Sequence, residues 1–112
     1  MKKDKKKMTD KDREVAVELK RRLSVAMDLV DFRVFGSRAR GDAAEFSDMD
    51  VFIEVEHLSR QIKTEIRDIV WEVGMEYSLY ISPVIFTRSE IEDSPLRSSF
   101  IVSNIRDEGV PV

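Results

Sequence analysis

With 112 residues the chain has room for one domain, and 19 basic against 22 acidic residues give a net charge of -3, which argues against wrapping nucleic acid. No cysteine is present, so thiolate metal sites and cysteine nucleophiles are excluded, and a metal would need carboxylates, which favour hard cations such as magnesium. The sequence has no apolar signal segment and no stretch of transmembrane length, so we expect a cytoplasmic protein that does not enter a membrane.

The N-terminal segment is a basic run, MKKDKKK, without apolar periodicity. We expect residues 1–8 to be a disordered tail and residues 9–112 to be a single domain. From Thr9 onward apolar residues recur every three or four positions, which predicts a helix capped by Thr9 or Asp10. The predicted core-facing stripe of this helix comprises Val15, Leu19, Leu23, Ala26 and Val30.

Two strands are predicted in the middle of the chain. Residues 31–35 are rich in β-formers and stop at Gly36, and residues 38–46 suit a short helix or turn that begins at Ser37. Residues 48–56 alternate with period two, which separates a core face from a polar face. The core face carries Met49, Val51, Ile53 and Val55, and the other face carries Asp48, Asp50, Phe52, Glu54 and Glu56.

The C-terminal half is predicted to be a helix, a strand and a last helix. Ser59 caps the first of these, Gly74 ends it, and Trp71 packs at the edge of its stripe. Residues 77–86 form a strand in which Pro83 indicates a bulge or an unpaired side. Ser89 with Glu92 suits a capping box, Ser94 starts the last helix and Gly109 ends it, with a core stripe of Leu96, Phe100, Ile101 and Ile105.

This element order predicts a small mixed α/β fold, with a sheet of about three to four strands flanked by helices. Met27, Phe100 and Trp71 fit helical core faces better than a cofactor site. His57, at the end of the acidic strand, is interpreted as a surface residue.

Gly36 and Ser37 form the first candidate site. Glycine lets a phosphate approach the backbone, and the amides at the start of a helix, with the Ser37 hydroxyl, can donate hydrogen bonds to it. Arg38 and Arg40 carry guanidinium groups that suit triphosphate oxygens. The dipeptide alone is also typical of an ordinary turn.

Asp48 and Asp50 form the second candidate site. At spacing i, i+2 on a strand their carboxylates share a face, where they repel each other unless a dication binds both. The alternative is a solvent-facing acidic edge that continues through Glu54 and Glu56.

Together, Gly36-Ser37-Arg38-Ala39-Arg40-Gly41-Asp42 and Ser47-Asp48-Met49-Asp50 resemble the minimal nucleotidyltransferases of the DNA polymerase beta superfamily. Ser82-Pro83-Val84 and the segment from Asn104 to Val110 extend the resemblance over nearly the whole chain. It implies a nucleotidyltransferase fold, nucleotide phosphates on Gly36 and Ser37, and Mg²⁺ on the catalytic Asp48 and Asp50. Arg38 and Arg40, beside that turn, are predicted to bind the same nucleotide.

In that family a third carboxylate completes the metal site and activates the attacking hydroxyl, and here its position is taken by Tyr80. A phenol cannot routinely replace a carboxylate as a magnesium ligand or base at neutral pH. Glu76 shares the expected strand parity of Tyr80, but it lies four residues upstream, ~13 Å along an extended strand. Either Glu54 or a partner supplies an acid, or the domain binds nucleotide with little catalysis, or the strand register at Tyr80 differs.

Two functions are therefore open. The first is a magnesium-dependent enzyme that transfers AMP from ATP to a hydroxyl acceptor, for which the resemblance implies a HEPN-type partner toxin. The second is a catalytically weak antitoxin or interaction module that binds nucleotide and metal and neutralises a partner or assembles with copies of itself. Tyr80 favours the second function.

Overall fold

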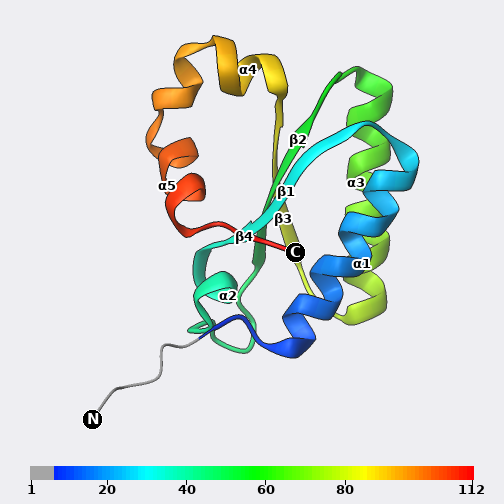
Figure 1. Cartoon of the computed structure of the whole chain (residues 1–112). Coiled ribbons are helices and arrows are strands. Elements are labelled where there is room, and N and C mark those ends of the chain that lie inside the picture. The colour runs from blue at the N-terminus through cyan, green and yellow to red at the C-terminus, as the bar shows by residue number, and fades with distance from the viewer. Residues whose placement is uncertain (1–6) are drawn as a thin grey trace.

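The computed structural model describes residues 7–112 (Figure 1). Its helices are α1 (Asp10–Ala26), α2 (Gly36–Arg40), α3 (Arg60–Tyr77), α4 (Arg88–Asp93), the short 3-10 helix η1 (Pro95–Ser98) and α5 (Phe100–Glu108). Its strands are β1 (Leu29–Phe35), β2 (Met49–Val55), β3 (Ile81–Thr87) and β4 (Val110–Pro111). None of the helices in this range has the length and apolar character needed to cross a bilayer.

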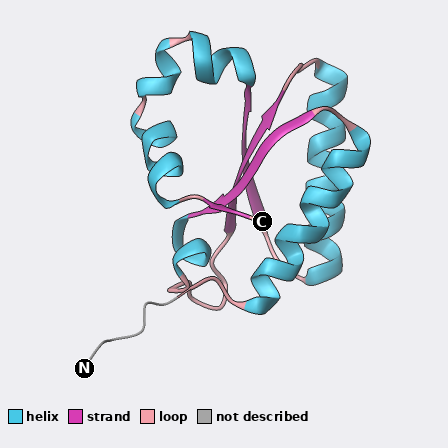
Figure 2. Ribbon diagram, in the orientation of Figure 1, coloured by secondary structure: helices cyan, strands magenta, loops and turns pink. Residues whose placement is uncertain are grey.

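The four strands form one mixed sheet in the order β3-β2-β1-β4. β1 pairs antiparallel with both β2 and β4, whereas β2 and β3 run parallel. Helices α1 and α3 cover one face of the sheet, α4 and α5 cover the other, and α2 lies at one end of it (Figures 1 and 2). The predicted mixed α/β fold is confirmed.

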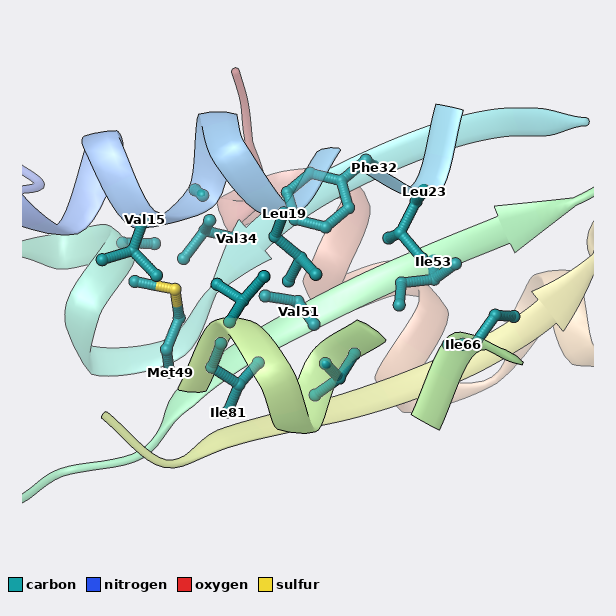
Figure 3. Close-up of a cluster of buried hydrophobic side chains, with 14 of the residues drawn as sticks. Val15, Leu19, Leu23, Phe32, Val34, Met49, Val51, Ile53, Ile66 and Ile81 are labelled. Carbon is teal, nitrogen blue, oxygen red and sulfur yellow. The ribbon is translucent and has the colours of Figure 1, made fainter. Parts of the chain in front are cut away.

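The main core lies between the sheet and the helices α1 and α3 (Figure 3). The predicted core face of β2 is confirmed, because its four apolar residues are at most 1% exposed. Side chains of α1, β1 and α3 pack against that face, among them Leu19, Leu23, Phe32, Val34 and Ile66. The period-two pattern of β2 and the stripe of α1 are therefore the parts of the sequence that position the sheet.

The opposite face of β2 is also covered, which the sequence pattern did not predict. Phe52 is 4% exposed and Glu54 is 7% exposed, because Ile91 of α4 and Val102 of α5 lie over this face of the sheet. The alternative of a solvent-facing acidic edge is therefore wrong at Glu54. Burial raises the pKa of Glu54 above its ordinary value, and the neighbouring Asp31 carboxylate raises it further.

Helix α3 is longer than predicted. Gly74 does not end it, and the helix continues to Tyr77, with Ser78 in the left-handed conformation as its C-cap. Gly74 is needed for another reason: a Cβ there would lie 2.7 Å from the carbonyl oxygen of Leu79. Glu76 is consequently a helical residue paired with Arg22, and it does not share a strand with Tyr80.

The predicted caps hold at three helix ends and fail at others. Thr9 caps α1, Ser59 caps α3 and Gly109 follows α5, as predicted. The stripe of α1 ends early, because Ala26 is exposed and Val30 belongs to β1. The structure replaces the other predicted caps: Thr87 and Glu90 form the capping box of α4, Ser94 caps η1, and Ser99 caps α5.

Two aromatic residues predicted on core faces are exposed. Trp71 is 63% exposed, and Phe100 is 85% exposed because Val102 and Ile105 form the buried side of α5. Pro83 causes no bulge, since β3 is an edge strand and pairs with β2 in regular register.

The predicted tail falls mostly on residues 1–6, which lie outside the described residues. Met8 is 8% exposed and belongs to the core. A Cβ on Gly41 would lie 2.2 Å from the carbonyl oxygen of Lys7, so the backbone at Lys7 also packs closely. Packing therefore begins at least one residue before the expected domain start.

We predict that Glu54→Gln raises the free energy of unfolding at neutral pH, because it removes a charge that burial disfavours. The pKa of Glu54 is higher in the folded state than in the unfolded state. The wild type is therefore destabilised by the buried charge at neutral pH, and it regains this stability as the pH falls through the folded-state pKa. Below the ordinary glutamate pKa of about 4.3 the two proteins should have equal stability. Urea denaturation across this pH range measures the difference, and a variant less stable at neutral pH would contradict the prediction.

Candidate active site

The centre of the candidate site is a contact between Gly36 and Asp50. Gly36 follows β1 directly and has φ 74°, in the left-handed region that glycine tolerates. The register of β1 against β2 pairs Phe35 with Asp50, so the turn lies against the Asp50 side chain. A Cβ at position 36 would be 2.5 Å from the Asp50 carboxylate oxygen Oδ2. The residue must therefore be glycine both for its conformation and for the space that Asp50 occupies.

The amides in the first turn of α2 have no side-chain cap. Its N-cap residue is Phe35, which supplies no side-chain hydrogen bond to the first amides. In any helix these amides also lack acceptors within the helix. Ser37 is partly buried on this turn, next to Gly36. The predicted phosphate-binding pair is thus adjacent to one of the predicted metal ligands.

Asp48 and Asp50 lie at the N-terminal end of β2. Asp48 is exposed and Asp50 is half-buried. Burial raises the pKa of the Asp50 carboxyl above its ordinary value, the Asp48 charge raises it further, and Arg40 opposes both effects. The two negative charges repel each other, and a bound dication would remove that repulsion by using both carboxylates as ligands.

These two carboxylates fit Mg²⁺, which proteins commonly hold with one or two carboxylates together with substrate phosphates and water. No cluster of three or more histidine or acidic side chains suitable for a metal occurs in residues 7–112. Glu54 does not complete the pair, because it is four residues further along β2, ~13 Å away in an extended strand. The electrostatic neighbours of Glu54 are Asp31, Arg88, Glu92 and Glu56.

The pairing of β3 with β2 places Tyr80 beside the two aspartates. Asp50 pairs with Ser82, and the Met49 N–H donates a hydrogen bond of 2.9 Å to the Tyr80 carbonyl oxygen. Tyr80 is 68% exposed. Tyr80, the residue at the third-acid position that the resemblance implies, therefore lies next to the candidate site.

Arg38 was predicted to bind nucleotide, but its guanidinium is engaged within the fold. Nη1 lies 3.0 Å from an Asp12 carboxylate oxygen, Nε donates to the Ser47 carbonyl at 2.9 Å, and Nη2 donates to the Glu45 carbonyl at 3.1 Å. Both partners of the ion pair are nearly buried, with side-chain exposures of 11% and 9%. Arg38 therefore ties helix α1 to the loop that leads into Asp48.

Asp12 is the site-supporting residue that sequence reasoning missed. It lies in the first turn of α1, where an acid is ordinarily a solvated residue that suits the helix dipole. The one local signal is its position in the helix, since Asp12 is three residues before the core residue Val15 and so lies on the buried side.

The Arg40 guanidinium is exposed and could exchange its present partners for a ligand. Its side chain is 49% exposed and makes ion pairs of 3.3 Å with Asp42 and 3.4 Å with Glu108. Exposed pairs of this kind contribute little and rearrange readily. Since Arg40 also acts on the pKa of Asp50, its charge is felt at the candidate metal pair.

Known proteins match this chain over most of its length. A family model described as "Nucleotidyltransferase domain" matches residues 12–110. One Methanocaldococcus jannaschii protein, provisionally named a protein adenylyltransferase, is 33% identical over 102 residues, which cover 88% of this chain and 96% of that protein. A second protein of that organism with the same provisional name is 41% identical over 61 residues, 52% of this chain and 42% of the relative. This second match spans less than half of that relative.

A solved structure with a related description also matches. It is a crystal structure of a protein from Sulfolobus solfataricus, provisionally described as a nucleotidyltransferase. The two chains are 18% identical, with a TM-score of 0.47, and the match covers 72% of this chain and 71% of the other.

We predict that Arg38→Met lowers the free energy of unfolding by about 3–5 kcal/mol, because it leaves the nearly buried Asp12 carboxylate without its partner. The matched variant Arg40→Met removes only exposed ion pairs and should change stability by about 0–1 kcal/mol. Urea denaturation measures both. Equal stability of the two variants would mean that the Arg38 contacts do not hold the loop.

Proposed function

Because the chain belongs to the nucleotidyltransferase domain family, we propose that it transfers AMP from ATP to a hydroxyl group of an acceptor protein. The observation that carries this proposal is the contact between the Gly36 turn and the Asp50 carboxylate, which brings the proposed phosphate-binding turn against the proposed metal pair. The provisional names of the two archaeal relatives support a protein as acceptor and adenylate as the transferred group.

Each site residue has a separate task in this proposal. The Gly36 and Ser37 amides and the Ser37 hydroxyl donate hydrogen bonds to phosphate oxygens, and Arg40 neutralises charge on them. Asp48 and Asp50 would hold Mg²⁺. The ion would supply the positive charge that offsets the charge developing on the phosphate oxygens during transfer. Arg38 holds the loop before Asp48 in place and so orients the carboxylate indirectly.

The transfer is a substitution at phosphorus. The acceptor hydroxyl oxygen forms a bond to the α-phosphorus while the bond from that phosphorus to the bridging oxygen breaks, and pyrophosphate leaves with the electron pair. The hydroxyl proton must go to a base. The described residues bring no third carboxylate to this place. In this proposal the proton therefore passes to water, to a group of the acceptor protein or to one of the two aspartates.

A second candidate function follows from Tyr80. Without a third carboxylate the domain would bind nucleotide and Mg²⁺ but turn over slowly, and it would act as an antitoxin by contact with a HEPN-type partner or as a self-associating module. In either function we propose a cytoplasmic protein. Label transfer from ATP to the HEPN-type protein distinguishes the two: no transfer with intact partner binding would reject the enzyme.

We predict that Asp48→Asn and Asp50→Asn each weaken magnesium-dependent ATP binding by roughly tenfold or more, since each removes one of two anionic ligands. Glu56→Gln, an acid just beyond the other end of β2, is the matched control and should bind as the wild type does. Titration with a fluorescent ATP analogue, with and without Mg²⁺, measures the effect. Unchanged binding in both aspartate variants would show that the site lies elsewhere.

We predict that Tyr80→Asp raises Mg²⁺ affinity or the rate of AMP transfer by roughly tenfold, because it places a carboxylate beside Asp48 and Asp50. Tyr80→Asn is the control, since it has the same size as the aspartate variant without its charge. Isothermal calorimetry with Mg²⁺ and a nucleotide-transfer assay report the two effects. Identical behaviour of both variants would remove Tyr80 from the third-acid position.

A further inference from the structure

An apolar groove of about 670 Å³ lies between the last turns of α3 and the start of β3. Its walls include Val70, Trp71 and Met75 on α3, then Leu79 and Tyr80, and finally Pro83 on β3. Trp71 and Met75 are each 63% exposed, so large apolar side chains face solvent here. Exposed apolar surface of this extent commonly marks a site of interaction.

The groove begins at the candidate active site. Tyr80 lines it, and the carbonyl oxygen of Tyr80 accepts the N–H of Met49, the residue between the two aspartates. The end of α3 and the start of β3 lie at the same end of the sheet as α2 (Figure 1). The groove residues Ile81 and Pro83 pair with Met49 and Val51 on the core face, whereas Asp48 and Asp50 lie on the other face. A molecule bound in the groove would reach the metal pair by passing over Tyr80 at the edge of the sheet.

The strand order indicates which of the two substrates, the nucleotide or the acceptor, lies on the β3 side of the metal pair. In this sheet β2 separates β1 from β3. Under the proposed function the triphosphate lies on the Gly36 turn after β1, and Asp48 and Asp50, at the start of β2, would hold the Mg²⁺ that neutralises the α-phosphate. Phosphoryl chemistry places the attacking and leaving oxygens on opposite sides of phosphorus. With pyrophosphate on the β1 side, the acceptor hydroxyl approaches from the β3 side, where the groove is.

We propose that this groove binds an apolar segment of the acceptor protein and so presents its hydroxyl to the site. The inference rests on the proposed function. Among the groove residues, Arg67 is the one that carries a charge, and it has no ion-pair partner in the described part of the chain. It lies eleven residues before Ser78 on α3, ~16 Å from the Tyr80 end. The segment that fits has its hydroxyl at one end, apolar residues between, and an acid at the other.

The edge of β3 shows how the segment is held. The Tyr80 carbonyl faces β2, and the Thr87 N–H bonds to the Glu90 side chain, outside the sheet. Since backbone direction alternates along a strand, the backbone of Pro83 faces the open edge, and proline offers no N–H there. Pairing of a partner strand with this edge is thereby disfavoured. The segment is held by its side chains in the groove.

Solution NMR on the complete isotope-labelled chain tests this inference. One probe is a short synthetic peptide with a tyrosine, then leucines and phenylalanine, then a glutamate; the other has serines in place of the apolar residues. The apolar peptide should shift the Trp71 indole and Met75 methyl resonances, and the serine peptide should not. Equal binding of both peptides, no binding, or shifts confined to α4 and α5 would overturn the inference.

Trp71→Ala should weaken binding of the apolar peptide by roughly tenfold, as truncation of a central aromatic contact does. Phe100→Ala is the matched control, because Phe100 is also an exposed aromatic residue, at 85%. It lies on α5, on the opposite face of the sheet from α3. ATP affinity measured on the same samples separates this inference from the proposed function. Unchanged ATP affinity with lost peptide binding supports the groove, whereas loss of both in Trp71→Ala overturns its role as a docking residue.

Discussion

The antiparallel register between β1 and β2 is the constraint on which the candidate site depends. It pairs Phe35 with Asp50, so the turn that follows β1 meets a carboxylate near the start of β2. A shift of one residue would turn every side chain of β2 to the other face, moving Asp50 into the core. The buried apolar face of β2 fixes this register, and through it hydrophobic packing positions the polar chemistry.

Local patterns in the sequence were enough for the fold class, and they also identified the two pairs of residues that the fold brings together as the candidate site. The alternation of residues 48–56 predicted the two faces of β2, and Thr9, Ser59 and Gly109 marked real helix ends. The resemblance to minimal nucleotidyltransferases is confirmed by the family match and the archaeal relatives. These features are visible because each depends on residues close together in the chain.

Features that depend on distant residues were not predictable. Arg38 was assigned to phosphate because nothing near it in sequence reveals Asp12, which is 26 residues away along the chain. The alternative that put Glu54 at a solvent edge is wrong because its burial depends on α4 and α5, which come much later. Gly74 was read as a helix end although its role is to admit the Leu79 carbonyl. In each case tertiary packing, rather than local preference, decided the outcome.

Pro83 has a consequence for the behaviour of the protein in solution. An open edge strand beside an exposed apolar groove is an arrangement that favours uncontrolled growth of β-structure between molecules. A proline in the middle of that edge interrupts the row of hydrogen-bond donors that a neighbouring chain would need. The protein can thus expose an apolar surface near its candidate site, while Pro83 disfavours aggregation by strand pairing at the adjacent edge of β3.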